Sequence, residues 1–252
     1  MKFAIVTGAS RGLGEETAKN LLTQGYNLFT ISRKRKTNEL KNLANENRQS
    51  YYHHSCDLSD LEKLNDVLYE IVTKLQDQNI EELLIVNNAG MVTPIGPVGS
   101  LENHDIVKHI SVNLTAIMLM VNTMKKHVES NRLFVVNISS GAGENGVYGW
   151  NAYCSTKSAV NMYTETAALE AKELKSKDLH IAFSPGVMDT EMQEEIRSSD
   201  EEDFKNVDKF KQYKEEGKLR SPKEVADLLT DLIQKPDEIE NGKVYRVYDL
   251  VK

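Results

Sequence analysis

The chain has 252 residues, of which 40% are hydrophobic and 27% charged, and its formal net charge is −7. These values are typical of a globular protein and exclude a disordered chain, a collagen and a disulfide scaffold. The acidic balance argues against nucleic acid as a partner. The longest apolar run, 116–121, is too short to cross a bilayer, and the run at 3–6 is too short for a signal peptide. We therefore expect a cytoplasmic protein with neither nucleic acid nor membrane as its partner.

The chain contains two cysteines, Cys56 and Cys154, and we expect both to be free thiols. They form no Cys/His spacing typical of a zinc site, and the six histidines show no metal-like grouping. The sequence therefore predicts no metal site.

Predicted strands and helices alternate along the whole chain. Short apolar runs predict strands at 2–7, 27–32, 51–56, 83–86, 133–138, 180–184 and 244–248. Helices are predicted at 13–22, 37–48, 61–75, 105–127, 153–174 and 222–233, from apolar spacing in all but the polar segment 37–48. The alternation predicts an α/β fold, a Rossmann-type doubly wound parallel sheet of about seven strands with helices on both faces. We expect one domain over 1–252, with a polar substrate-loop insertion at 191–217 that acts as a lid.

A glycine loop joins the first predicted strand to the first helix. Its residues run Thr7-Gly8-Ala9-Ser10-Arg11-Gly12-Leu13-Gly14. Glycine lets the backbone turn tightly and approach a pyrophosphate, and the helix N-terminus supplies free N–H groups and the positive end of a dipole. A plain strand-to-helix turn is the alternative, but the place after the first strand of an alternating chain favours a dinucleotide site.

This loop resembles the cofactor loop of the short-chain dehydrogenases/reductases. Further segments resemble the motifs of that family, in the same order, up to the C-terminus. The matching segments are Asp57-Leu58, Asn87-Asn88-Ala89-Gly90, Asn113, Ser140, Tyr153-Cys154-Ser155-Thr156-Lys157, Pro185-Gly186-Val187 and Thr190. The resemblance implies an oxidoreductase that acts on CH–OH and C=O groups with a nicotinamide cofactor. It also implies which residues bind that cofactor, namely Gly8, Ser10, Arg11, Gly12, Leu13, Gly14, Asp57, Leu58, Asn88, Ala89, Gly90, Tyr153, Lys157, Pro185, Gly186, Val187 and Thr190.

Tyr153 and Lys157 are four residues apart in a predicted helix and therefore share one face. We expect the nearby ammonium to lower the phenol pKa, so that Tyr153 protonates a substrate oxygen as hydride arrives at carbon. The resemblance further implies that Lys157 reaches the nicotinamide ribose, that Ser140 holds and polarises the carbonyl, and that Asn113 holds a water linking Lys157 to solvent. A surface Tyr/Lys pair and a strand-ending serine are the alternatives. The family order favours a catalytic set of Ser140, Tyr153, Lys157 and Asn113.

The second predicted strand ends Thr30-Ile31-Ser32-Arg33, without the carboxylate that NAD enzymes place on the ribose hydroxyls. Arg33 and Arg11 are therefore interpreted as ligands of a 2′-phosphate. This predicts NADP(H) as the cofactor. The neighbouring Lys34, Arg35 and Lys36 are expected to form a solvated loop.

Two segments resemble those of two groups within the family, the sepiapterin reductases and the bacterial benzil reductases. Both groups reduce a ketone beside a second carbonyl. They are Gly149-Trp150-Asn151-Ala152-Tyr153 and Pro185-Gly186-Val187-Met188-Asp189-Thr190-Glu191-Met192-Gln193. Ungapped matching puts Arg246 where sepiapterin reductases anchor the pterin with Asp, and an arginine cannot accept the pterin N–H groups. A slip of the match would bring Asp249 there instead.

We therefore expect a benzil reductase-like enzyme that forms a chiral α-hydroxy ketone from a 1,2-dicarbonyl compound, with a pterin reductase as the alternative. Besides Ser140 and Tyr153, Trp150 and Met192 are candidate substrate contacts, with plain packing as their alternative. A non-catalytic dinucleotide sensor is disfavoured because Tyr153 and Lys157 are both present. The resemblance also implies a homodimer through the helices at 105–127 and 153–174.

Overall fold

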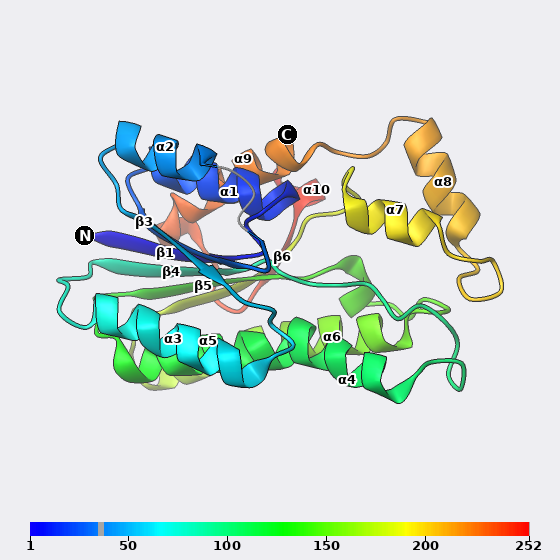
Figure 1. Ribbon diagram of the computed structural model, residues 1–252, viewed down its shortest axis with the longest axis horizontal. Coiled ribbons are helices and arrows are strands. Elements are labelled where there is room, and N and C mark those ends of the chain that lie inside the picture. The colour runs from blue at the N-terminus through cyan, green and yellow to red at the C-terminus, as the bar shows by residue number, and fades with distance from the viewer. Residues whose placement is uncertain (35–37, 252) are drawn as a thin grey trace.

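A computed structural model describes residues 1–34 and 38–251 and contains one seven-stranded sheet (Figure 1). All neighbouring strands are parallel, in the order β3-β2-β1-β4-β5-β6-β7. The strands are β1 (Lys2–Thr7), β2 (Asn27–Ser32), β3 (Tyr51–Ser55), β4 (Glu82–Asn87), β5 (Leu133–Ile138), β6 (Leu179–Ser184) and β7 (Val244–Arg246). The predicted Rossmann-type fold is thus confirmed.

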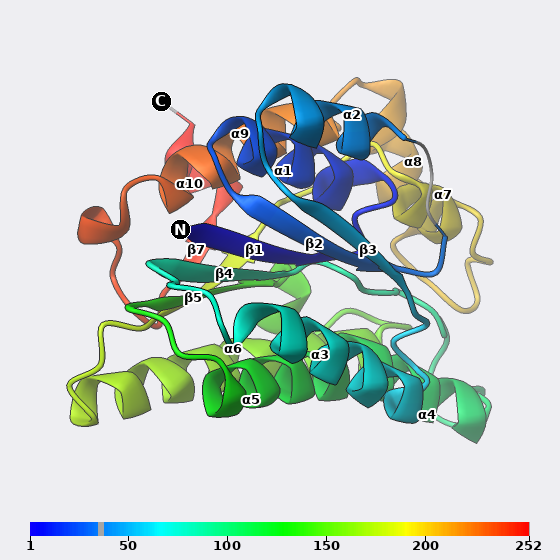
Figure 2. The same cartoon turned by 60° about the vertical axis from the view of Figure 1, so that its left-hand side comes forward.

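Helices cover both faces of the sheet, as Figures 1 and 2 show from two directions. On one face lie α1 (Gly12–Thr23), α2 (Glu39–Glu46), α9 (Pro222–Ile233) and α10 (Val247–Leu250). On the other lie α3 (Leu61–Leu75), α4 (Asn103–Ile110), α5 (Ala116–His127) and α6 (Asn151–Glu173). The helices α7 (Glu191–Arg197) and α8 (Val207–Glu215) stand beyond the carboxyl ends of the strands.

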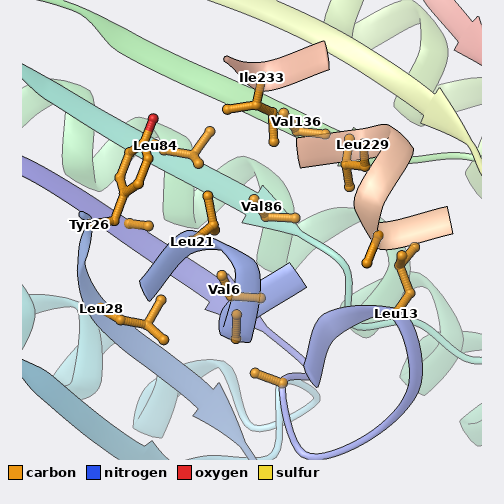
Figure 3. Close-up of a cluster of buried hydrophobic side chains, with 14 of the residues drawn as sticks. Val6, Leu13, Leu21, Tyr26, Leu28, Leu84, Val86, Val136, Leu229 and Ile233 are labelled. Atoms are coloured by element: carbon orange, nitrogen blue, oxygen red, sulfur yellow. The ribbon is translucent and has the colours of Figure 1, made fainter. Parts of the chain in front are cut away.

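Each face of the sheet has its own hydrophobic core, because the strands are buried on both sides. Figure 3 shows the core under α1 and α9, where Leu13 and Leu21 meet Val6 and Val86 of the sheet and Leu229 of α9. On the other face, α3 and α5 contribute a second cluster that packs on the alternate residues of the same strands. The apolar residues of the strands are therefore used in the two cores, and functional side chains can lie only at the ends of the strands.

The stretch Asn103–His127 is long and apolar enough to cross a membrane by length and composition, with a mean hydropathy of 1.3. A core helix meets the same criterion. Here α5 packs against α3 and the sheet, so we treat this stretch as part of the helical layer. It is also not the single regular helix predicted at 105–127, because a π-helical turn, Ser111–Thr115, separates α4 from α5.

Several other boundaries differ from prediction by one or two residues, among them those of the last strand and of the helix predicted at 37–48. The strand predicted at 244–248 ends at Arg246, because its partner β6 ends at Ser184 and the following Pro185 has no N–H for a ladder. Val247 instead turns into the core as the start of α10. The helix predicted at 37–48 is observed over Glu39–Glu46, and position 37 lies outside the described residues. The polar insertion at 191–217 contains α7 and α8.

Candidate active site

The glycine loop between β1 and α1 forms a cradle that side chains would fill. Gly8 and Gly12 adopt φ angles of 68° and 59°, in the left-handed region that favours glycine. A Cβ on Gly14 would lie 2.6 Å from the carbonyl oxygen of Gly8, and one on Gly8 would lie 3.0 Å from Ala89 Cα. The loop backbone is therefore close-packed against the protein, where Gly8 and Gly14 leave no room for a side chain.

Arg11 occupies the N-cap of α1 and gives this helix no side-chain cap. Its guanidinium instead forms an ion pair with Glu191, in the first turn of α7. The first N–H groups of α1 are left for an anion, at the positive end of the helix dipole. Ser10 precedes this cap in the loop, while Leu13 points away into the core.

The segment after β4 is fastened to the end of β1. The N–H groups of Asn88 and Ala89 both donate to Thr7 Oγ1, each at 3.0 Å. The Asn88 amide donates to the Thr7 carbonyl oxygen at 2.9 Å. The predicted cofactor residues Asn88, Ala89 and Gly90 are thereby placed beside the glycine loop, at the point where the strand order reverses direction.

The residues predicted for the adenosine end lie after β2 and β3. Arg33 is exposed directly after β2, and its carbonyl oxygen accepts from Ser55 Oγ at 3.1 Å. Burial would raise the pKa of Asp57, but donation from the N–H and hydroxyl of Ser59 leaves that pKa below its usual value. Leu58 is buried. Lys34 is exposed as expected, whereas Arg35 and Lys36 lie outside the described residues.

Ser140, Tyr153 and Lys157 come together between β5 and α6. Ser140 follows β5 and is hydrogen-bonded to the Tyr153 phenol. Lys157 Nζ lies 5.7 Å from the centre of the Tyr153 ring and donates to the Ile138 carbonyl oxygen at 2.7 Å. Tyr153 is 7% exposed and Lys157 5%, so both polar groups are largely withdrawn from water.

This burial controls the titration of both groups. It raises the pKa of Tyr153, and only the hydrogen bond from Ser140 opposes the rise. It lowers the pKa of Lys157 to about 8. The expectation that Lys157 lowers the phenol pKa is therefore not met, because desolvation outweighs the attraction of an ammonium that points at Ile138.

Asn113 lies in the π-helical turn and is completely buried. Its Oδ1 accepts from the N–H of Met91 at 2.9 Å, and its Nδ2 donates to the Met91 carbonyl oxygen at 2.8 Å. A Cβ on Gly90 would lie 3.3 Å from Asn113 Oδ1 and 3.8 Å from Lys157 Nζ. The structure thus brings Asn113, Gly90 and Lys157 together, and Asn113 ties its helix to the segment after β4.

The segment after β6 closes another side of the cradle. Gly186 has a φ of 70°, and a Cβ there would lie 2.8 Å from the Tyr248 hydroxyl. The Val187 carbonyl oxygen accepts from the N–H of Arg220 at 3.1 Å, which holds the chain just after Pro185. Thr190 forms the N-cap of α7 and lies near Gly12.

Trp150 and Met192 belong to an aromatic cluster that sequence reasoning did not find. Trp150 stacks on Phe204 with ring centres 4.7 Å apart and meets the Tyr153 ring edge-on at 5.3 Å. Phe210 of α8 packs on the same indole, and Met192 borders the cluster. The insertion at 191–217 is therefore anchored on the N-terminal end of the catalytic helix.

Arg246 lies at the end of β7 and donates to both carboxylate oxygens of Glu144, at 3.2 and 2.5 Å. Asp249 is 4.0 Å from the same guanidinium. Glu144 belongs to the loop that follows Ser140. The position predicted to distinguish pterin reductases thus holds an arginine that is paired to this loop.

Over residues 1–34 and 38–251, no group of three or more His, Cys, Asp or Glu is placed to hold a metal ion. Cys56 is a buried free thiol, and Cys154 is a partly buried one next to Tyr153.

The family model described as "short chain dehydrogenase" matches residues 2–201. Together with the parallel sheet, the glycine cradle and the Ser–Tyr–Lys cluster, this match shows that the chain belongs to the short-chain dehydrogenase/reductase family of oxidoreductases, which bind NAD or NADP.

Within this family, the chain is 40% identical over 249 residues to a benzil reductase ((S)-benzoin forming) of Bacillus cereus, covering 98% of this chain and 99% of the relative. It is 36% identical over 253 residues to a benzil reductase ((S)-benzoin forming) of Bacillus subtilis strain 168, covering 100% of both. Among solved structures it is similar to the KRED1-Pglu enzyme, with a TM-score of 0.78, 26% identity, and coverage of 97% and 100%.

Proposed function

We propose that this protein reduces one ketone of a 1,2-dicarbonyl compound to a chiral α-hydroxy ketone, with NADPH as the hydride donor. The observation that carries the proposal is the buried cluster of Ser140, Tyr153 and Lys157 beside the glycine cradle. Near-full-length similarity to two benzil reductases supports the substrate class.

The residues fit a dinucleotide. Gly8 and Gly14 let the loop pack tightly on itself and on the segment after β4, and the uncapped start of α1 presents N–H groups suited to a pyrophosphate. When bound, NADPH supplies the hydride. The protein positions it with the glycine loop, with the segment Asn88–Gly90, and with Pro185, Gly186, Val187 and Thr190, while Asp57 and Leu58 lie toward the adenine end.

The chain itself handles the carbonyl oxygen and the proton. Ser140 lies close enough to the Tyr153 phenol to act against the rise of its pKa, so the two hydroxyl groups border one place where a carbonyl oxygen can accept a hydrogen bond. The raised pKa keeps Tyr153 protonated and able to donate its proton to the developing alkoxide. Lys157 is assigned to the nicotinamide ribose rather than to the phenol, because its ammonium points at the Ile138 carbonyl oxygen and does not lower the phenol pKa.

Two arginines support the choice of NADPH over NADH. Arg33 is exposed at the end of β2, the position where NAD enzymes carry an acid. Arg11 is the second candidate, but its guanidinium is paired with Glu191. Both side chains of this pair are about half exposed. Breaking the pair, so that Arg11 can bind a 2′-phosphate, therefore costs at most roughly 1 kcal/mol of interaction free energy.

The pterin alternative is disfavoured by Arg246. Its guanidinium has only donors and pairs with Glu144, so it offers nothing to the N–H groups of a pterin ring. The aromatic cluster around Trp150 supports a bulky, apolar substrate near Tyr153. Plain packing remains the alternative for Trp150 and Met192, since both belong to that cluster.

The test is the loss of NADPH or NADH absorbance with benzil, with a small aliphatic diketone and with sepiapterin. We expect NADPH oxidation with the diketones and little with sepiapterin. Turnover of sepiapterin alone would replace this proposal with a pterin reductase. Tight NADPH binding without turnover of any of these substrates would leave a different carbonyl substrate or a dinucleotide sensor.

We further propose that the protein acts as a cytoplasmic homodimer. The helices α4, α5 and α6 carry large apolar side chains that are exposed to solvent. These side chains are Val107, Ile110, Met118, Met162 and Leu169. A second copy of the chain would bury this surface by helix packing. Light scattering should give twice the chain mass, and a monomeric mass would refute the dimer.

A further inference from the structure

His109 is a fully buried histidine in the last turn of α4, one helical turn before the catalytic Asn113. Neither the sequence motifs nor the proposed chemistry assigns it a role. The only sequence signal was its spacing of four residues from Asn113, which places the two polar side chains on one face of the predicted helix. Each of its two ring nitrogens has a polar neighbour.

The hydrogen bonds around His109 fix both its tautomer and its charge. The ring Nδ1 lies 2.7 Å from the Thr93 carbonyl oxygen, which can only accept, so Nδ1 carries a proton. The Asn113 amide is oriented independently by its two bonds to the Met91 backbone. Its remaining N–H therefore points at His109 Nε2, 2.9 Å away, and this nitrogen must be an unprotonated acceptor.

The same nitrogen reaches the catalytic helix. Thr156 Oγ1 lies 3.0 Å from His109 Nε2, and its one hydroxyl proton can be donated to this nitrogen or to the carbonyl oxygen of Ala152 or Tyr153. Thr156 directly precedes Lys157 in α6. One imidazole thus joins three separate segments: the loop after β4, the π-helical turn with Asn113, and the turn of α6 between the catalytic tyrosine and lysine.

We propose that His109, as a neutral Nδ1–H imidazole, is a positioning residue that holds the Asn113 amide and the Tyr153–Lys157 turn of α6 in register. The proposal rests on the proposed reductase function for its kinetic readout. A protonated ring would set N–H against the N–H of Asn113 and push that amide out of line with its two bonds to Met91. Burial lowers the pKa of His109, donation to Thr93 opposes this, and the facing Lys157 ammonium of α6 lowers it further, so the neutral form is favoured.

Three substitutions separate an acceptor role from mere packing. His109→Gln can place an amide oxygen near the former Nε2 and keep the acceptor for Asn113. His109→Asn can keep the donor to Thr93 but not that acceptor, and His109→Phe keeps only the ring shape. Leaving a buried N–H without its acceptor costs about 1–3 kcal/mol, which corresponds to a loss of roughly 5- to 150-fold.

We expect His109→Gln to keep kcat within about 5-fold of wild type, and His109→Asn and His109→Phe to lose roughly 5- to 150-fold. The Kd for NADPH, measured by fluorescence, should stay within about 3-fold of wild type, because the glycine cradle does not contact the ring. His180→Phe is the matched control, since it removes another buried histidine from the start of β6 and should leave kcat unchanged. Equal rates for His109→Phe and His109→Gln would overturn the proposal.

A second measurement does not depend on turnover. Long-range ¹H–¹⁵N spectra of histidine-labelled protein report the tautomer of each ring. We expect His109 to be neutral with the proton on Nδ1 from pH 7 to pH 9, and an Nε2–H or cationic ring would overturn the proposal. If the wild-type protein binds NADPH but reduces no diketone, the proposed function fails, while this spectrum still decides the assignment of His109.

Discussion

Replacing Lys157 with Met should separate catalysis from stability, because this residue carries a charge in a buried place. Its side chain is 5% exposed, and desolvation lowers its pKa from 10.5 to about 8. At 1.36 kcal/mol for each pKa unit, holding the charged form at pH 7 costs the folded state about 3 kcal/mol. The hydrogen bond to the Ile138 carbonyl oxygen offsets part of this cost, and its loss in Lys157→Met leaves that oxygen unpaired at about 1–3 kcal/mol.

Lys157→Met should therefore be as stable as wild type at pH 7, or more stable by up to about 2 kcal/mol, while losing turnover. The pH dependence is the sharper prediction. Between pH 8 and 10.5 the unfolded chain holds the proton that folded Lys157 has released, so wild-type stability rises with pH in this window. From pH 7 to pH 9.5 the wild type should gain about 2 kcal/mol relative to Lys157→Met.

Urea unfolding of both proteins across this pH range measures the difference. Lys172→Met, which removes an exposed lysine from the last turn of the same helix, is the control and should differ from wild type by the same amount at every pH. A stability difference between wild type and Lys157→Met that does not change with pH would refute the argument that the Lys157 ammonium is held at a cost.

Three further changes test the remaining assignments. Tyr153→Phe should lower kcat by roughly 10²- to 10⁴-fold and leave the Kd for NADPH nearly unchanged, because it removes the proton donor alone; wild-type rates would exclude Tyr153 as the acid. Arg33→Ala should raise the KM for NADPH about 10-fold or more but not the KM for NADH, and an equal change for both cofactors would argue against a 2′-phosphate contact. Glu191→Gln should lower the KM for NADPH by up to about 5-fold by releasing Arg11, and an unchanged value would show that Arg11 does not bind the phosphate.

The order of strands and helices was predictable from sequence because buried parallel strands are nearly uninterrupted apolar runs. The glycine loop was predictable because its conformational demands are local. The π-helical turn at Asn113 was not, since apolar spacing continues through it and one extra residue per turn leaves no pattern. The end of β7 was missed because it depends on where β6 stops pairing.

The contacts between the residues of the candidate site were harder to predict than the identity of these residues. The pairing of Trp150 with Phe204 joins residues separated by an insertion whose fold has no local signal. The direction of the Tyr153 pKa shift depends on how completely the ring is buried and on where Lys157 points, and both follow from packing. The role of His109 likewise depends on Thr93 and Thr156, which lie 16 and 47 residues away in sequence.

One hydrogen-bonded frame connects the cofactor cradle to the catalytic helix. Thr7 of β1 holds the N–H groups of Asn88 and Ala89, and a few residues further the Met91 backbone holds Asn113. Asn113 then reaches the catalytic helix through the neighbouring imidazole. Because each link is a directional contact that is buried or partly buried, a shift of the segment after β4 would be transmitted to both ends. The relative placement of the glycine loop and of the turn from Tyr153 to Lys157 is therefore set by the loops at one end of the sheet, and the strands beneath provide rigid support.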